Sequence, residues 1–137
     1  MTKFGNNDLI TARVALNAIQ LLAMFAVPVP VIPAPGKNKA IVIDSILVQT
    51  VPGTVNFAAG GVVTFVYHGG GVTPHAGNIP AATVLSATGT TNMLAPVAAL
   101  IQIPANTGVD ITNATGAFTL GNGAAIVTIW YSIQTLG

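Results

Sequence analysis

The sequence predicts an all-β protein, built as a β-sandwich or a barrel. Glycine and proline recur roughly every ten residues, and the runs between them are rich in valine, isoleucine and threonine; β-branched runs between turn residues are typical of such folds. No internal repeat and no linker interrupts the 137 residues, and this length suits one domain. We therefore expect a single all-β domain over residues 1–137.

At most one short helix is expected, near residues 18–25. The run Asn17-Ala18-Ile19-Gln20 has the spacing of a capping box, in which the asparagine accepts a hydrogen bond from the first turn and the glutamine reaches back. The helix must end before Pro28, because the residue before a proline is pushed toward extended geometry. A strand over residues 21–27 is the alternative, since a short apolar run does not separate the two.

Residues 27–33 (VPVPVIP) alternate proline with β-branched residues. Proline has no amide hydrogen to donate, so this segment cannot be a central strand. It is predicted to be an edge strand or a polyproline segment that lies on a partner. The run Ala34-Pro35-Gly36-Lys37 then predicts a type II turn, with proline at the second position and glycine at the third.

The clearest strand is predicted over residues 40–51, which are apolar on both faces near the middle and therefore buried on both sides. Further strands are predicted over residues 62–68, 98–103, 109–112 and 124–134. Residues 69–80 and 86–96 are predicted to be loops. The second loop carries Met93 and Leu94 near its end, and such a tip is suited to a contact.

Charged residues are scarce in this chain. Four basic and three acidic residues make up 5% of the sequence, against about 25% in an ordinary soluble domain. Two explanations are open: the 16 threonines and 10 asparagines solvate the uncharged surface, or copies of the chain or a partner cover it. Free monomers normally keep uncharged patches small, which favours the second explanation.

Neither nucleic acid nor a membrane is an expected partner. A net charge of +1 with four scattered cations gives no electrostatic footprint for nucleic acid. The longest apolar run, residues 18–35, contains a glutamine and four prolines, which a membrane-spanning helix tolerates poorly. The first thirteen residues include Asn6, Asn7 and Asp8, so a signal peptide is not expected.

We expect neither catalysis nor a metal or cofactor site. The chain has no cysteine, no glutamate and three serines, which leaves few groups for catalysis. His68 and His75 flank a glycine-rich stretch, but a metal site would need Asp44 or Asp110 as well, and none of these residues lie at motif spacing.

Asp44 lies inside an otherwise apolar strand, where a carboxylate must find a partner or face solvent. The available partners are Arg13, Lys37 and Lys39, from the same chain or from a neighbouring subunit. Lone charges in such places can fix the register of an assembly.

Five segments of the chain carry a further signal. They combine a leucine pair, a Pro-Ala-Pro-Gly turn, a basic residue leading into a β-branched strand, a Gly-Gly-Val-Val-Thr-Phe-Val-Tyr-His run and a C-terminal aromatic pair. In chain order these are residues 21–22, 33–36, 39–43, 60–68 and 130–131. In these segments the chain resembles the capsid decoration, or cement, proteins of tailed bacteriophages.

The resemblance implies a jelly-roll-like fold and a non-enzymatic structural role on the capsid surface of a virion. Such proteins are commonly homotrimers that bind the major capsid protein on the outside of the expanded shell and stabilise it. We accordingly expect oligomer or capsid contacts at the proline segment, at the basic residues after it and at the tip of the second loop. These residues are Val29, Val31, Ile32, Lys37, Lys39, Met93 and Leu94.

Two other functions stay open at this point. One is a tail or fibre-type virion protein whose loops, residues 69–80 and 86–96, bind a receptor. The other is a surface β-sandwich adhesin. Location in the particle would separate the first from a decoration protein, and a processed N-terminus would favour the second.

Overall fold

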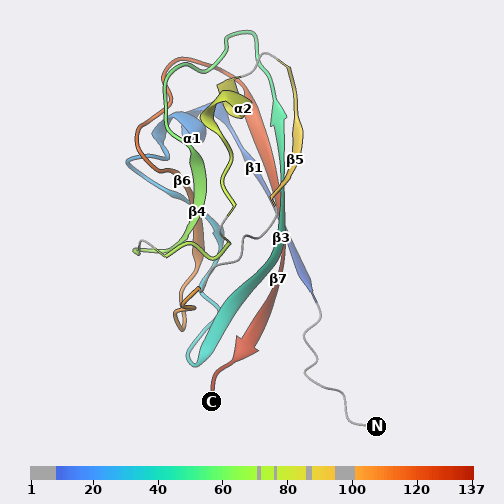
Figure 1. Ribbon diagram of the computed structural model, residues 1–137, viewed down its shortest axis with the longest axis vertical. Helices are drawn as coiled ribbons and strands as arrows, with labels where there is room; N and C mark the ends of the chain where they lie inside the picture. Colours follow the sequence, from blue (N-terminus) through green and yellow to red (C-terminus); the bar gives the residue numbers. More distant parts are fainter. Residues whose placement is uncertain (1–8, 71, 76, 86–87, 95–100) are drawn as a thin grey trace.

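The computed structural model describes residues 9–70, 72–75, 77–85, 88–94 and 101–137, and shows two antiparallel sheets packed face to face (Figure 1). Sheet A has the strand order β1-β7-β3-β5, and sheet B has the order β2-β6-β4. The strands are β1 (Ile10–Leu16), β2 (Val29–Ile32), β3 (Lys39–Val51), β4 (Val63–Tyr67), β5 (Thr91–Leu94), β6 (Val109–Asn113) and β7 (Ala124–Thr135). The predicted all-β sandwich is confirmed.

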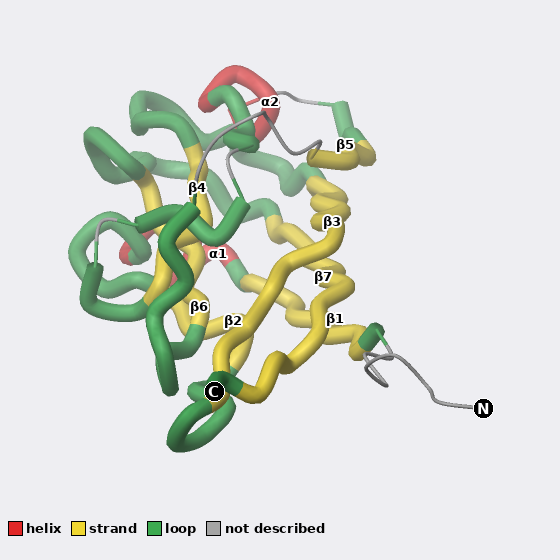
Figure 2. The backbone as a smooth tube through the Cα atoms, turned by 60° about the horizontal axis from the view of Figure 1, so that its bottom comes forward, coloured by secondary structure: helices red, strands yellow, loops and turns green. Residues whose placement is uncertain are grey.

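Consecutive strands alternate strictly between the two sheets: odd-numbered strands lie in sheet A and even-numbered strands in sheet B. Figure 2 shows the two layers, so strands that follow one another in the sequence lie in different layers. This winding is typical of a jelly-roll-like sandwich rather than of a meander of hairpins. An isolated bridge between Val63 and Ile79 adds a residue beside β4, at the outer edge of sheet B.

The core lies between the sheets, and its centre is the long pair of β3 and β7. Ile41, Ile46 and Ile129 are fully buried on the inner face of sheet A, where they contribute to one cluster with Phe65 and Ile111 of sheet B. Each such side chain stabilises the fold by about 1.5–3 kcal/mol relative to an exposed position. This burial is the main source of stability for a chain that has so few charges.

Tyr67 adds a polar link between the two sheets. Its hydroxyl donates a hydrogen bond of 2.6 Å to the backbone oxygen of Ile41, so β4 of sheet B is tied to β3 of sheet A. Burial raises the pKa of Tyr67 to about 12. The hydroxyl therefore keeps its proton and its donor role at neutral pH.

Two Phe-x-x-Gly segments close one end of the sandwich. Phe57 begins the first and Phe118 the second, and their rings lie 5.7 Å apart between centroids. Ala58 and Thr119 exchange two backbone hydrogen bonds of 2.7 and 2.8 Å. Each segment then turns through two residues with positive φ, Ala59 and Gly60 in the first, Leu120 and Gly121 in the second.

The predicted helix is confirmed as α1 (Ala18–Ala23), and the alternative of a strand over residues 21–27 is wrong. Asn17 Oδ1 accepts from the Gln20 backbone at 2.9 Å, and Gln20 Oε1 accepts from the Asn17 backbone at 3.0 Å, so both halves of the capping box form. The expectation of at most one helix is wrong, because a second short helix, α2, covers Ala81–Leu85. It begins directly after Pro80, a residue whose fixed φ suits the start of a helix.

The proline segment is an edge strand, as one of the two interpretations predicted. β2 lies at the outside of sheet B and pairs only with β6, with a register shift between Pro30 and Ile32. The turn that follows is two residues later than predicted: Lys39 N–H donates to Gly36 O at 3.2 Å, and Asn38 carries a positive φ of 59°. Asparagine tolerates this left-handed conformation at the third position of the hydrogen-bonded turn. Gly36 itself has a φ of +112°, a positive value as the predicted turn requires at that residue.

The other strand predictions were partly right. The ends of β3, β4, β6 and β7 lie within one residue of the predicted strands, which were residues 40–51, 62–68, 109–112 and 124–134. The strand predicted over residues 98–103 is wrong for residues 101–103, which are in no strand, and residues 98–100 lie outside the described part. β1 was not predicted, and β5 occupies part of the predicted loop 86–96 because its short run pairs with β3.

Candidate contact surfaces and a polar cavity

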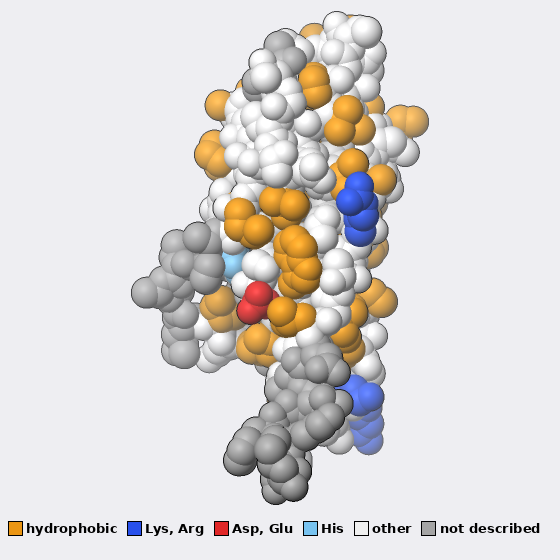
Figure 3. Space-filling model, turned by 90° about the vertical axis from the view of Figure 1, so that its right-hand side faces the viewer, with side chains coloured by type: hydrophobic (Ala, Val, Ile, Leu, Met, Phe, Trp, Pro, Cys, Tyr) orange, Lys and Arg blue, Asp and Glu red, His pale blue; other side chains and the backbone are white. Residues whose placement is uncertain are grey.

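The outer face of sheet A carries large apolar side chains among neutral polar ones and few charges. The register places Met93, Leu47, Thr128 and Arg13 in one row across the four strands, and Thr91, Gln49, Ile126 and Ala15 in the next. Trp130 and Val42 also point outward, because Ile129 and Ile41 beside them point into the core. Figure 3 shows hydrophobic side chains gathered in a strip along this face. Antiparallel sheets that face water usually carry polar residues there instead.

Two opposite charges lie on this outer face, Arg13 on β1 and Asp44 on β3. Asp44 occupies a bulge between Ile43 and Ser45, which turns its side chain outward, and Ser45 Oγ donates to it at 3.2 Å. By strand spacing and rise, the two charged residues are about 14 Å apart. Neither forms an ion pair with any residue of the described ranges.

A second apolar surface is a groove of about 270 Å³ between α1 and the proline segment, residues 27–30. Ile19 on α1 is 77% exposed, and Val27 and Phe25 are exposed beside it. These three residues were not among the predicted contacts. The capping box located the start of this helix, but no pattern in the sequence showed which of its apolar residues face outward.

The predicted contact residues divide into two groups. The side chains of Val31, Ile32 and Leu94 are buried in the core of the chain, so they are not available as contact residues and that part of the prediction is corrected. Their apolar character serves the sandwich, because they point inward from β2 and β5. The side chains that remain accessible are Val29 in the groove, Lys37 and Lys39 at the turn, and Met93, 57% exposed, on the outer face of sheet A.

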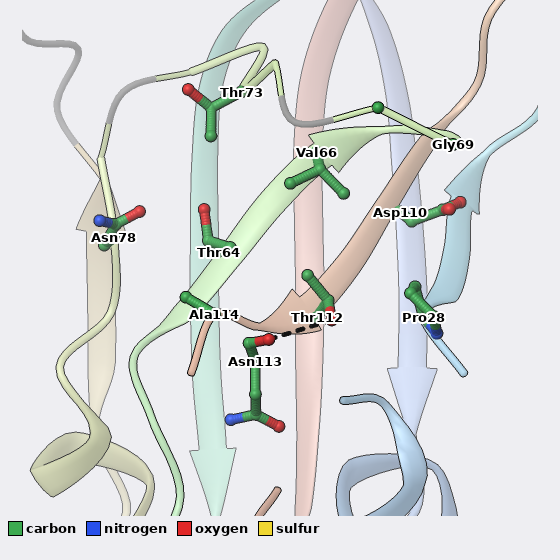
Figure 4. Close-up of a pocket in the computed structure, with 11 residues that line it drawn as sticks. Pro28, Thr64, Val66, Gly69, Thr73, Asn78, Asp110, Thr112, Asn113 and Ala114 are labelled. Carbon is green, nitrogen blue, oxygen red and sulfur yellow. Dashed lines mark hydrogen bonds between the residues drawn. The ribbon is translucent and has the colours of Figure 1, made fainter. Parts of the chain in front are cut away.

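A cavity of about 570 Å³ with both polar and apolar lining lies on the outer face of sheet B (Figure 4). Its floor is formed by outward side chains of β4 and β6, and its walls by Pro28 and by loop residues between β4 and α2. The lining side chains used below are Thr64, Val66, Asp110 and Thr112. Asp110 is only 3% exposed, although it lies on the outward side of β6.

Asp110 is held by His68, and sequence reasoning did not foresee this pair. His68 Nδ1 lies 2.7 Å from Asp110 Oδ2, while the histidine side chain is 72% exposed at the rim. Val66 lies opposite Asp110 in the β4–β6 register, and His68 follows β4 directly. Among the described residues, no group of three or more histidines or acidic residues comes together to hold a metal ion.

His75 is far from solvent, although it was predicted in a loop. It is 2% exposed, and neither ring nitrogen has a hydrogen-bond partner among the described residues. Burial lowers the pKa of His75 below its ordinary value of 6.5, and the negative charge of Asp44 offsets part of this effect. The imidazole of His75 is therefore neutral in the folded chain at neutral pH.

We predict that the free energy of unfolding falls as the pH drops below 6.5. In the unfolded chain His75 binds a proton near pH 6.5, whereas in the folded chain it binds one only at a lower pH. Between the pKa of the unfolded chain and that of the folded chain, proton binding therefore favours the unfolded state. Above pH 6.5 this effect is absent. Urea unfolding between pH 8 and pH 5 measures this. His75→Phe should flatten the dependence; a His75→Phe profile as steep as the wild type would contradict the assignment.

No helix among the described residues is long and apolar enough to span a membrane. Comparison of the chain with protein-family models, with curated proteins and with solved structures finds no match.

Proposed function

We propose that this chain is a non-enzymatic structural protein of a phage virion, a head decoration protein that binds the outside of the expanded capsid as a homotrimer and stabilises it. The observation that carries the proposal is the outer face of sheet A, where an apolar strip lies beside two charges that form no ion pair with any described residue. The family resemblance of the sequence and the jelly-roll-like winding support the same role.

In this proposal the outer face of sheet A joins the copies. A ring of three needs a heterologous contact, in which one patch of a subunit meets a different patch of the next. Arg13 and Asp44 are separate charges of opposite sign on one face, so Arg13 of one copy can meet Asp44 of the next and fix the register. The apolar strip, with Leu47 and Trp130 near its middle, then supplies the buried area between the charges.

The groove beside α1 is the surface proposed for the shell. Ile19 and Val27 project from it, and the prolines of β2 keep the segment extended, which lowers the entropy cost of docking. Lys37 and Lys39 lie exposed at the turn beyond β2. Subunits that bind only the expanded shell stabilise that state by mass action, and three linked contact sites per trimer add avidity.

The first test is the native mass of the purified chain by light scattering over a hundredfold dilution. A trimer that resists dilution is expected. Leu47→Gln should weaken it because the variant puts a polar group into the strip, whereas Leu120→Gln, at an exposed position outside this face, should not. A monomer at every concentration would overturn the self-association proposed here.

The second test is co-sedimentation of the wild-type trimer with phage shells before and after expansion. Binding to expanded shells alone is expected, and Ile19→Asp should abolish this binding without changing the native mass. A trimer that binds neither kind of shell would contradict the decoration role. It would favour a tail or fibre-type protein instead, for which the cavity beside loop residues 69–78 is the supporting feature.

A further inference from the structure

Four outward side chains of sheet B together form the floor of the cavity. In the β4–β6 register Thr64 lies opposite Thr112, and Val66 lies opposite Asp110. Directly opposed side chains of an antiparallel pair have Cβ atoms about 4.5–5.5 Å apart. Three oxygen-bearing side chains therefore surround one apolar side chain on neighbouring strands, and all four line the cavity.

These oxygens are withdrawn from bulk water. Thr64, Asp110 and Thr112 are all buried, although they lie on the outward side of their strands. The loop after β4 and the segment at Pro28 rise on either side of them, as Figure 4 shows. Burying a carboxylate costs free energy that donors must offset. Among the described residues, the hydrogen-bond partner of Asp110 Oδ2 is His68 Nδ1.

The hydrogen-bonding character of this block is that of an acceptor. The Thr112 hydroxyl already donates to the Met24 backbone oxygen at 2.8 Å, and Thr64 Oγ1 lies 3.4 Å from the Phe65 oxygen. Hydroxyl groups whose hydrogen is used elsewhere offer lone pairs, and a carboxylate only accepts. None of the described lining residues is basic, so the cavity suits a ligand that brings donors and a positive charge.

We propose that the cavity binds a primary alkylammonium group, carried by a lysine side chain of another polypeptide or by a free small amine. The ammonium group, with three donors and one compact charge, lies among the oxygens of Asp110, Thr64 and Thr112. The alkyl chain lies against Val66 and Pro28. The cavity volume of about 570 Å³ is within the range of about 300–1,000 Å³ that small-ligand sites occupy.

Other donor-rich groups fit this cavity less well. A guanidinium group gains most from pairing with both oxygens of a carboxylate, but Asp110 Oδ2 already accepts from His68. A neutral polyol brings donors without the charge that would offset the buried carboxylate. The proposal is independent of the self-association of sheet A, because the cavity lies on the opposite sheet.

The test compares n-pentylamine with 1-pentanol, its neutral isostere, by calorimetry and by the NMR shifts of the Val66 methyl groups. The amine is expected to bind at least ten times more tightly than the alcohol, and Asp110→Asn should remove this preference. Equal binding of both probes, or an amine preference that survives Asp110→Asn, would overturn the proposal.

A second variant tests the same site in case Asp110→Asn does not fold. Thr64→Val removes an acceptor whose own hydrogen bond is long, so the sheet should keep its melting temperature while the amine binds at least threefold more weakly. N-acetyl-lysine methylamide and its ε-acetylated form then distinguish the two sources of the group. Tighter binding of the lysine derivative than of pentylamine supports a polypeptide ligand, the reverse order supports a free amine, and equal binding of the acetylated form overturns both.

Discussion

Alanine at position 121 is expected to lower the free energy of unfolding by about 2–5 kcal/mol. Gly121 has a φ of +88°, a conformation that is strained for any residue with a Cβ, and the added methyl group would overlap the ring of Phe57. Phe57 cannot move aside freely, because its other side packs on Phe118. The midpoint of urea unfolding measures the loss, with the slope of the transition unchanged.

Gly69→Ala is the control for Gly121→Ala. Gly69 has a similar φ of +75°, but nothing lies within 4 Å of the position where a Cβ would be added. Its substitution should therefore cost only the backbone strain of about 1–2 kcal/mol. Gly60→Ala should match Gly121→Ala, since its methyl group would overlap Phe118 in the same way. If Gly69→Ala were as costly as the other two, contact with the rings would not be the cause.

The paired Phe-x-x-Gly segments show where sequence reasoning ended. The glycine in each segment is a local signal for a turn, and both glycines have a positive φ. The pairing of the two segments joins residues 61 positions apart, such as Ala58 and Thr119, and no local pattern encodes it. The same applies to β5, whose four residues become a strand only through pairing with β3.

Local chemistry explains the predictions that succeeded. The capping box of α1 lies within four consecutive residues, and β3 and β7 are long apolar runs that remain strands in any arrangement of the sheets. The contact prediction failed at Val31, Ile32 and Leu94 because hydrophobicity alone does not tell which face of a strand turns inward. Asp110 was not singled out, because its burial comes from loops that fold over the outer face of sheet B.

Charge reversal on the outer face of sheet A is expected to have the largest effect on assembly. Arg13→Asp or Asp44→Arg alone should weaken self-association at least about tenfold, because each places like charges together at a contact, and such pairs cost several kcal/mol. The double variant restores opposite charges with their positions exchanged, and it should recover most of the lost affinity. Sedimentation velocity over a dilution series measures all three proteins against the wild type.

Lys37→Asp separates the effect of position from that of net charge. It changes the net charge as much as Arg13→Asp does, but Lys37 lies at the turn before β3, off the outer face of sheet A. Self-association of this variant should equal that of the wild type. If the double variant assembles no better than either single variant, Arg13 and Asp44 do not meet across the contact. The apolar strip then sets the register without them, because a rescue by exchange requires that the two charges face each other.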